Sequence, residues 1–149
     1  MFVTNYFLFI SGLLGAVCIA GIAESVTSKC SGRPHYNVSL TAYYPDFNSG
    51  FESDYLDARG KKLRPLQNFL DGRCDYVTVG MDEDLNLAYG SSICVPELNE
   101  HFGMNIPFQV RDHGANLKGT GFSRMDICVR SEEDSYDKAV NGIVTIYVI

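Results

Sequence analysis

Three aspartates stand at or near the ends of apolar, strand-like runs in the second half of the chain. Asp82, Asp112 and Asp126 each follow or interrupt a run rich in Val, Ile, Met or Phe. A carboxylate is costly to remove from water, so three in such positions predict a shared polar site. Burial and neighbouring negative charge both raise the pKa of a carboxyl group and prepare it to donate a proton. The pattern therefore indicates general acid–base chemistry.

Each aspartate also has an ordinary structural explanation. Asp82 could cap a turn or a short helix, because two further acids follow it. Asp112 precedes His113 and Gly114 and could bond its own backbone in a turn. Asp126 could face water from one side of an alternating strand. The sequence leaves these alternatives open beside the shared site.

Short strands must hold these residues. Alternating or continuous apolar patterns predict six of them, at residues 38–43, 76–81, 92–95, 107–111, 125–129 and 143–148. Proline or a capping box before an apolar segment, with glycine after it, predicts short helices near residues 66–70, 96–102 and 132–141. Short strands with brief helices favour a mainly β fold, a small β-barrel with helical additions.

The chain begins with a segment typical of a signal peptide. Residues 6–22 are apolar or small and end in a small-x-small pattern before Glu24. We therefore expect residues 1–23 to be removed and the protein to be secreted; the length of the stretch is borderline for a membrane span, which leaves an uncleaved anchor as the alternative. Residues 24–36 are predicted to form an N-terminal arm, and residues 37–149 a single domain.

The charge balance limits the partners. The formal net charge is −6, which argues against binding to nucleic acid or to an anionic membrane surface. After removal of the leader we expect no membrane association, and we expect a monomer.

The cysteines agree with export. Four of them lie after the leader, an even number in a small secreted domain, which predicts two disulfides. Four cysteines allow three pairings and the sequence does not choose among them; our working prediction is Cys30–Cys74 and Cys94–Cys128.

No pattern indicates a metal or another cofactor. The three histidines are isolated, and neither Cys-x-x-Cys nor His-x-x-x-His occurs. Asn37 begins an Asn-Val-Ser sequon, so it is a candidate for glycosylation in a eukaryotic secretory pathway.

Six motifs follow one another over residues 38–149. In chain order they are Thr41-Ala42-Tyr43-Tyr44, Met81-Asp82, Leu87-Ala88-Tyr89-Gly90 before Ser92-Ile93-Cys94-Val95, Asp112-His113-Gly114-Ala115-Asn116-Leu117-Lys118-Gly119, Met125-Asp126-Ile127, and Val144-Thr145-Ile146-Tyr147-Val148.

In type and order these motifs resemble those of the three-aspartate (3D) domain of bacterial cell-wall lytic enzymes. The resemblance implies a six-stranded double-psi β-barrel and lytic transglycosylase activity on peptidoglycan, with cleavage of the β-1,4 bond between N-acetylmuramic acid and N-acetylglucosamine. It assigns the acid/base role to Asp126, with Asp112 and Asp82 beside it. We further expect Lys118, Thr41 and Tyr43 to contact the substrate. The alternative function is that of a non-catalytic barrel, either a carbohydrate-binding wall module or a secreted inhibitor or effector.

The chain differs from the family pattern at several places. His113 replaces a threonine, and Ala115 replaces a glycine that follows the second aspartate. The interval to Asp126 is longer, and Arg124 lies at its end. A long insertion, Phe51–Arg73, precedes the first aspartate.

Overall fold

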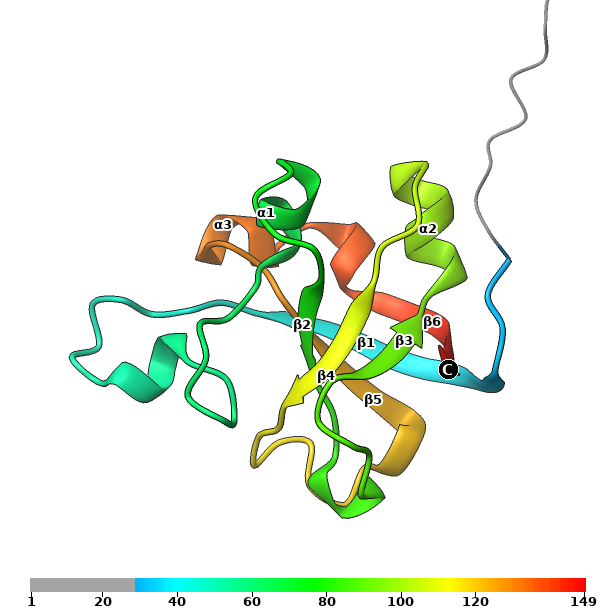
Figure 1. Ribbon diagram of the computed structural model, residues 1–149, viewed down its shortest axis with the longest axis horizontal. Coiled ribbons are helices and arrows are strands. Elements are labelled where there is room, and N and C mark those ends of the chain that lie inside the picture. The colour runs from blue at the N-terminus through cyan, green and yellow to red at the C-terminus, as the bar shows by residue number, and fades with distance from the viewer. Residues whose placement is uncertain (1–28) are drawn as a thin grey trace, which may run out of the picture.

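The computed structural model describes residues 29–149, so the predicted leader lies outside the described residues. Six strands form a closed barrel in the order β1-β5-β2-β4-β3-β6 (Figure 1). β1 runs parallel to β5, and β2 parallel to β4, whereas the other four pairs are antiparallel. The strands are β1 (Arg33–Tyr43), β2 (Val77–Gly80), β3 (Ser91–Cys94), β4 (Phe108–Asp112), β5 (Arg124–Cys128) and β6 (Gly142–Val148). The predicted mainly β fold, a small six-stranded barrel with short helices, is confirmed.

The barrel begins earlier than the predicted domain boundary at residue 37. Residues 33–35 pair with the end of β6, and the register shifts between His35 and Val38. Asn37 lies in this bulge with a φ of 57°, and its side chain is exposed. The last part of the predicted arm is therefore strand, because it completes the pairing of β1 with β6.

Three short helices cap the barrel, namely α1 (Leu66–Leu70), α2 (Pro96–Phe102) and α3 (Glu132–Ser135). The single helix predicted over residues 132–141 is wrong. The helical turn ends after Ser135, and the carboxylate of Asp137 accepts a hydrogen bond from the backbone N–H of Ala139 to start a separate 3₁₀ turn, η4 (Lys138–Val140).

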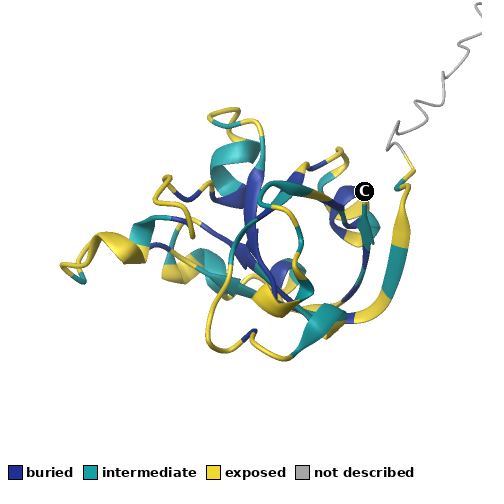
Figure 2. Cartoon of the chain, turned by 60° about the horizontal axis from the view of Figure 1, so that its bottom comes forward, coloured by how far each residue is buried: buried dark blue, intermediate teal, exposed yellow. Residues whose placement is uncertain are grey.

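Buried residues lie along the strands of the barrel, and exposed residues are mostly in the loops and turns (Figure 2). On β5 buried and partly exposed residues alternate, whereas all four residues of β2 are buried. On β5, Met125 and Ile127 are fully buried, so Asp126 between them points to the outer face of the barrel. All six strands contribute to the core, with Val38, Leu40, Val77, Val79, Ile93, Phe108, Val110, Met125, Ile127, Val144 and Ile146.

The first part of the insertion forms an extension beside the barrel, on the left in Figure 1, whereas its last part contains α1. It contains the 3₁₀ turn η1 (Glu52–Tyr55) and a bridge between Leu56 and Lys62. The backbone N–H of Ala58 donates to the carbonyl of Arg111 on β4 at 3.2 Å. The insertion is thus attached next to the strand that carries Asp112.

Candidate active site

Strand register brings two of the three predicted aspartates together. Gly80, the last residue of β2, pairs with Asp112 of β4 on one side and with Asp126 of β5 on the other. Two strand spacings separate the backbones of the two aspartates, on the order of 10 Å. Thr41 of β1 pairs with Asp126 on its other side. These residues thus form a row across four neighbouring strands.

A cavity of about 150 Å³ lies over this row. Asp112 and Asp126 line it together with Tyr43, Gly80 and Leu117. Gly80 leaves the space open, because a Cβ at this position would lie 3.2 Å from Cδ1 of Leu117. The absence of a side chain at the end of β2 therefore lets both aspartates face the same cavity.

Asp112 is a partly buried carboxyl group with two hydrogen-bond donors. The hydroxyl of Tyr43 donates to its Oδ2 at 3.0 Å, and the backbone N–H of His113 donates to Oδ1 at 3.0 Å. Desolvation by burial raises the pKa of Asp112 above its ordinary value, and outweighs these hydrogen bonds, which lower it. Burial, followed by the negative charges around it, also raises the pKa of Tyr43. Asp112 therefore retains its proton to a higher pH than an ordinary aspartate does.

Asp126 has a different environment. The hydroxyl of Thr41 donates to its Oδ1, and Nε of Arg124 lies 3.5 Å from the same oxygen. Nη2 of Arg124 donates to the Thr41 hydroxyl at 3.4 Å, while its buried Nε has no hydrogen-bond partner. A cation thus stands beside Asp126, and Asp112 has no such neighbour among its hydrogen-bond partners.

Asp82 is buried but is committed to the backbone. Its Oδ1 accepts from the N–H of Asp84 at 3.0 Å, and its Oδ2 accepts from the N–H of Gly121 at 2.8 Å. The Gly121 bond, followed by the Asp84 bond, lowers the pKa of Asp82. The carboxylate caps η2 (Glu83–Leu85) and ties it to η3 (Gly121–Ser123). It lines a neighbouring cavity with Asp112, not the one that holds Asp126.

The predicted substrate-binding residues separate into two groups. Thr41 and Tyr43 contact Asp126 and Asp112, as described above. Lys118 is exposed, and its ammonium group lies 2.8 Å from Oε1 of Glu83. This ion pair raises the pKa of Lys118. The lysine therefore pairs with the loop that follows Asp82 and not with the two aspartates of the cavity.

Three cavities meet at Asp112 and His113, which line all of them. A second cavity of about 310 Å³ is walled by the insertion, including Ser53 and Asp54. A third, of about 300 Å³, contains Arg59 of the insertion. This contribution of the insertion could not be predicted from the sequence, because no local pattern shows where an inserted segment docks.

The replacement of glycine by Ala115 causes no backbone strain. Among the non-glycine residues of the described chain, only Asn37 and Asn86 have a positive φ. The loop after Asp112 thus accommodates the alanine without the left-handed conformation that glycine would permit.

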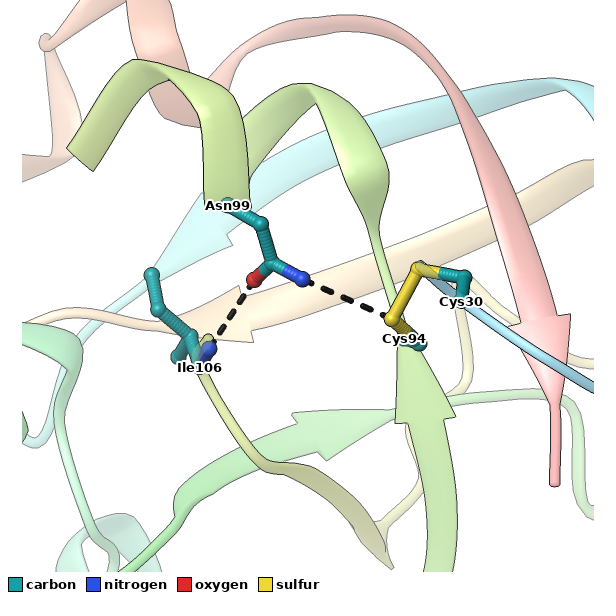
Figure 3. Close-up of a disulfide and its surroundings, with 4 residues drawn as sticks. All are labelled: Cys30, Cys94, Asn99 and Ile106. Carbon is teal, nitrogen blue, oxygen red and sulfur yellow. Dashed lines mark hydrogen bonds between the residues drawn. A yellow bond between two sulfur atoms is a disulfide. The ribbon is translucent and has the colours of Figure 1, made fainter. Parts of the chain in front are cut away.

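The disulfide pairing that we predicted is wrong. Cys30 bonds to Cys94, with 5.7 Å between their Cα atoms, and Asn99 lies beside the bond (Figure 3). β3 pairs with β6, and the arm runs past the end of β6, so the arm delivers Cys30 to the end of β3. Cys74 and Cys128 are free thiols. Burial raises the pKa of the Cys128 thiol.

Within residues 29–149 no three His, Cys, Asp or Glu side chains are placed to hold a metal ion. The same part of the chain contains no helix long and apolar enough to cross a membrane. The fold and the site define a small closed β-barrel in which two carboxyl groups, those of Asp112 and Asp126, line one cavity. No model of a known protein family matches this chain, and no curated protein matches it.

Proposed function

We propose that the protein is a secreted, monomeric enzyme that cleaves peptidoglycan by lytic transglycosylation. One observation carries the proposal: Asp112, a carboxyl group with a raised pKa, stands where three cavities meet and shares one of them with Asp126. The resemblance to the three-aspartate domain supports the same activity, and the Cys30–Cys94 disulfide supports secretion.

The reaction needs one carboxyl group that is protonated near neutral pH. That group donates its proton to the glycosidic oxygen as the bond between this oxygen and C1 breaks. The 6-hydroxyl oxygen of the same sugar then bonds to C1, and its proton returns to the carboxylate. The products are a 1,6-anhydro sugar end and a new free hydroxyl, so no water is consumed.

Two assignments of the acid compete. The resemblance gives the role to Asp126. The contacts support Asp112 as the proton donor, because burial raises its pKa, whereas Asp126 lies beside Arg124. In that arrangement Asp126 is the second carboxyl group beside the oxocarbenium-like transition state.

The test is mass spectrometry of peptidoglycan after incubation with the protein lacking residues 1–23. We expect 1,6-anhydro muropeptides from the wild type and a loss of about 10²–10⁴-fold in rate for the variant that lacks the acid. Asp112→Asn and Asp126→Asn are compared with Asp75→Asn, which removes an exposed carboxylate away from the site.

The pH profile identifies the acid. If Asp112 donates the proton, the fall of the wild-type rate at high pH reports the ionisation of Asp112. The residual rate of Asp112→Asn should then show no such fall, whereas the rate of Asp126→Asn should still show it. Absence of anhydro product from the wild type would refute the catalytic proposal.

One observation favours the alternative of a non-catalytic glycan-binding module. Phe47 and Phe51 are 71% and 68% exposed, and Tyr44 lines the cavity that the insertion walls. Exposed aromatic rings offer flat apolar faces on which sugar rings can stack. Retained affinity for peptidoglycan without any anhydro product would establish this function instead.

A further inference from the structure

Two arginines stack on one tyrosine in the 300 Å³ cavity beside Asp112. The guanidinium carbon of Arg59 lies 4.4 Å from the ring centroid of Tyr89, and that of Arg111 lies 4.7 Å from it. Arg111 also lies over Tyr76, at 4.3 Å. Cation–π stacking holds the planes of the guanidinium groups. Arg111 donates from Nε to Oε1 of Gln109 at 2.8 Å and from Nη1 to the Tyr89 hydroxyl, so its Nη2 is left for a ligand, whereas the described residues form no hydrogen bond with the guanidinium group of Arg59.

A buried carboxylate holds Tyr89 and Arg111 of this stack in place. Asp57, 6% exposed, accepts from the backbone N–H groups of Arg59 and Lys61, each at 2.9 Å. Its other oxygen accepts from the hydroxyl of Tyr89, which in turn accepts from Nη1 of Arg111 at 3.0 Å. The insertion is thereby held against the barrel before any ligand binds.

The positive charges of the stack have no ion-pair partner. Among residues 29–149, no carboxylate oxygen lies within 4.0 Å of a guanidinium nitrogen of Arg59 or Arg111. Two of the three acids that line the same cavity are already engaged, Asp82 by two backbone N–H groups and Glu83 by Lys118, and the third is Asp112 itself. The two guanidinium groups thus line the cavity of the candidate acid without a direct ion pair, and the carboxylate of Asp57 reaches Arg111 only through the Tyr89 hydroxyl.

We propose that Arg59 and Arg111 form a subsite for a carboxylate carried by the glycan. Arginine binds a carboxylate through paired N–H groups in a planar arrangement. The inference rests on the proposed function, since the subsite would hold a charged substituent of the glycan in a cavity that Asp112 also lines. The carboxylate belongs either to a sugar ring, as in a uronic acid, or to a peptide substituent of the sugar.

Calorimetric titration distinguishes these sources. The probes are a glucuronate-containing hexasaccharide and a muramyl-peptide disaccharide, each compared with its methyl ester, which removes the charge but keeps the shape. For one of the two probes, we expect the acid form to bind about tenfold more tightly than its ester. The probe that shows this preference identifies the source of the carboxylate. Equal affinity of acid and ester in both arms overturns the subsite.

Variants test whether the preference for the acid form depends on these two arginines. Arg59→Gln should remove the preference for the acid form, and Arg111→Lys should weaken it while keeping the charge. Arg73→Gln, an exposed arginine away from the cavity, should leave it unchanged. An equal loss in Arg59→Gln and Arg73→Gln would indicate a general charge effect and refute the subsite.

Binding of these probes does not require cleavage, so the two proposals fail separately. A preference for the acid form that depends on Arg59, without anhydro product, retains the subsite and refutes the enzyme. If the wild type produces anhydro sugar but binds the acid and ester forms equally, the enzyme is retained and the subsite is refuted.

Discussion

At the scale of single residues, the burial of Asp112 should be visible in the pH dependence of folding. Because its pKa is raised in the folded state, the folded protein binds the proton more tightly than the unfolded chain does. The free energy of unfolding therefore falls as pH rises from the unfolded-state pKa, near 3.9, through the folded-state pKa. Above that range the carboxylate remains a destabilising charge.

Asp112→Asn should remove this cost. We expect the variant to gain stability relative to the wild type between pH 3 and pH 7, with about 1.4 kcal/mol for each tenfold change in the acid constant of Asp112. Urea unfolding at both pH values measures the difference, with Asp75→Asn as the control. A stability difference that does not change with pH would contradict the raised pKa.

The sequence predicts the chemical type of these residues better than their roles. The three apolar runs predicted a shared site, and Asp112 and Asp126 do share a cavity because β4 and β5 both flank β2, an order that the runs did not predict. Asp82 follows the same pattern, yet its oxygens bind backbone N–H groups. That difference depends on where Gly121 lies, 39 residues away, and no local pattern reports it.

At the scale of elements, the end of β2 sets the width of the site. Gly80 lies between the two aspartates, and an added methyl group would press on Leu117. We expect Gly80→Ala to cost about 1 kcal/mol in folding stability and to reduce formation of anhydro product by narrowing the cavity. Thermal unfolding and the mass-spectrometric assay measure the two effects.

Gly142→Ala is the matched control, because an added Cβ there has no neighbour within 4 Å. It should leave product formation unchanged. If Gly80→Ala retains full activity while its stability falls, the cavity over Gly80 is not where the reaction occurs.

Helices were predictable where their boundaries are local. Pro96 opens α2 and Gly103 ends it with a φ of 66°, as the sequence indicated. The end of the helix after Ser131 could not be predicted in this way. The capping signal at Ser131 is correct, but Asp137 starts a second turn within the segment. Competing caps a few residues apart divide a helix that periodicity alone would continue.

At the scale of the whole molecule, the barrel could be predicted because each strand has its own local apolar pattern, alternating or continuous. The pairing of cysteines could not, since it depends on which strands become neighbours after the barrel closes. Cys30 lies before β1 and Cys94 ends β3, and only the β3–β6 pairing brings the arm to that strand. The insertion is similar: its length is visible in the sequence, but its docking on β4 is not.

The Cys30–Cys94 bond should stabilise the closed barrel as a whole. It joins residues 64 positions apart, and the loss of such a cross-link typically costs about 2–4 kcal/mol, because the unfolded chain gains freedom. We expect Cys30→Ser to lower the melting temperature, with Cys74→Ser, the loss of a free and partly exposed thiol, as the control.

Thiol titration of the unfolded, unreduced chain lacking residues 1–23 should find two free cysteines, Cys74 and Cys128. A titration that finds four free cysteines would refute the Cys30–Cys94 bond, and one that finds none would show that Cys74 and Cys128 are bonded as well. A Cys30→Ser variant that melts with the wild type would show that the bond does not stabilise the fold.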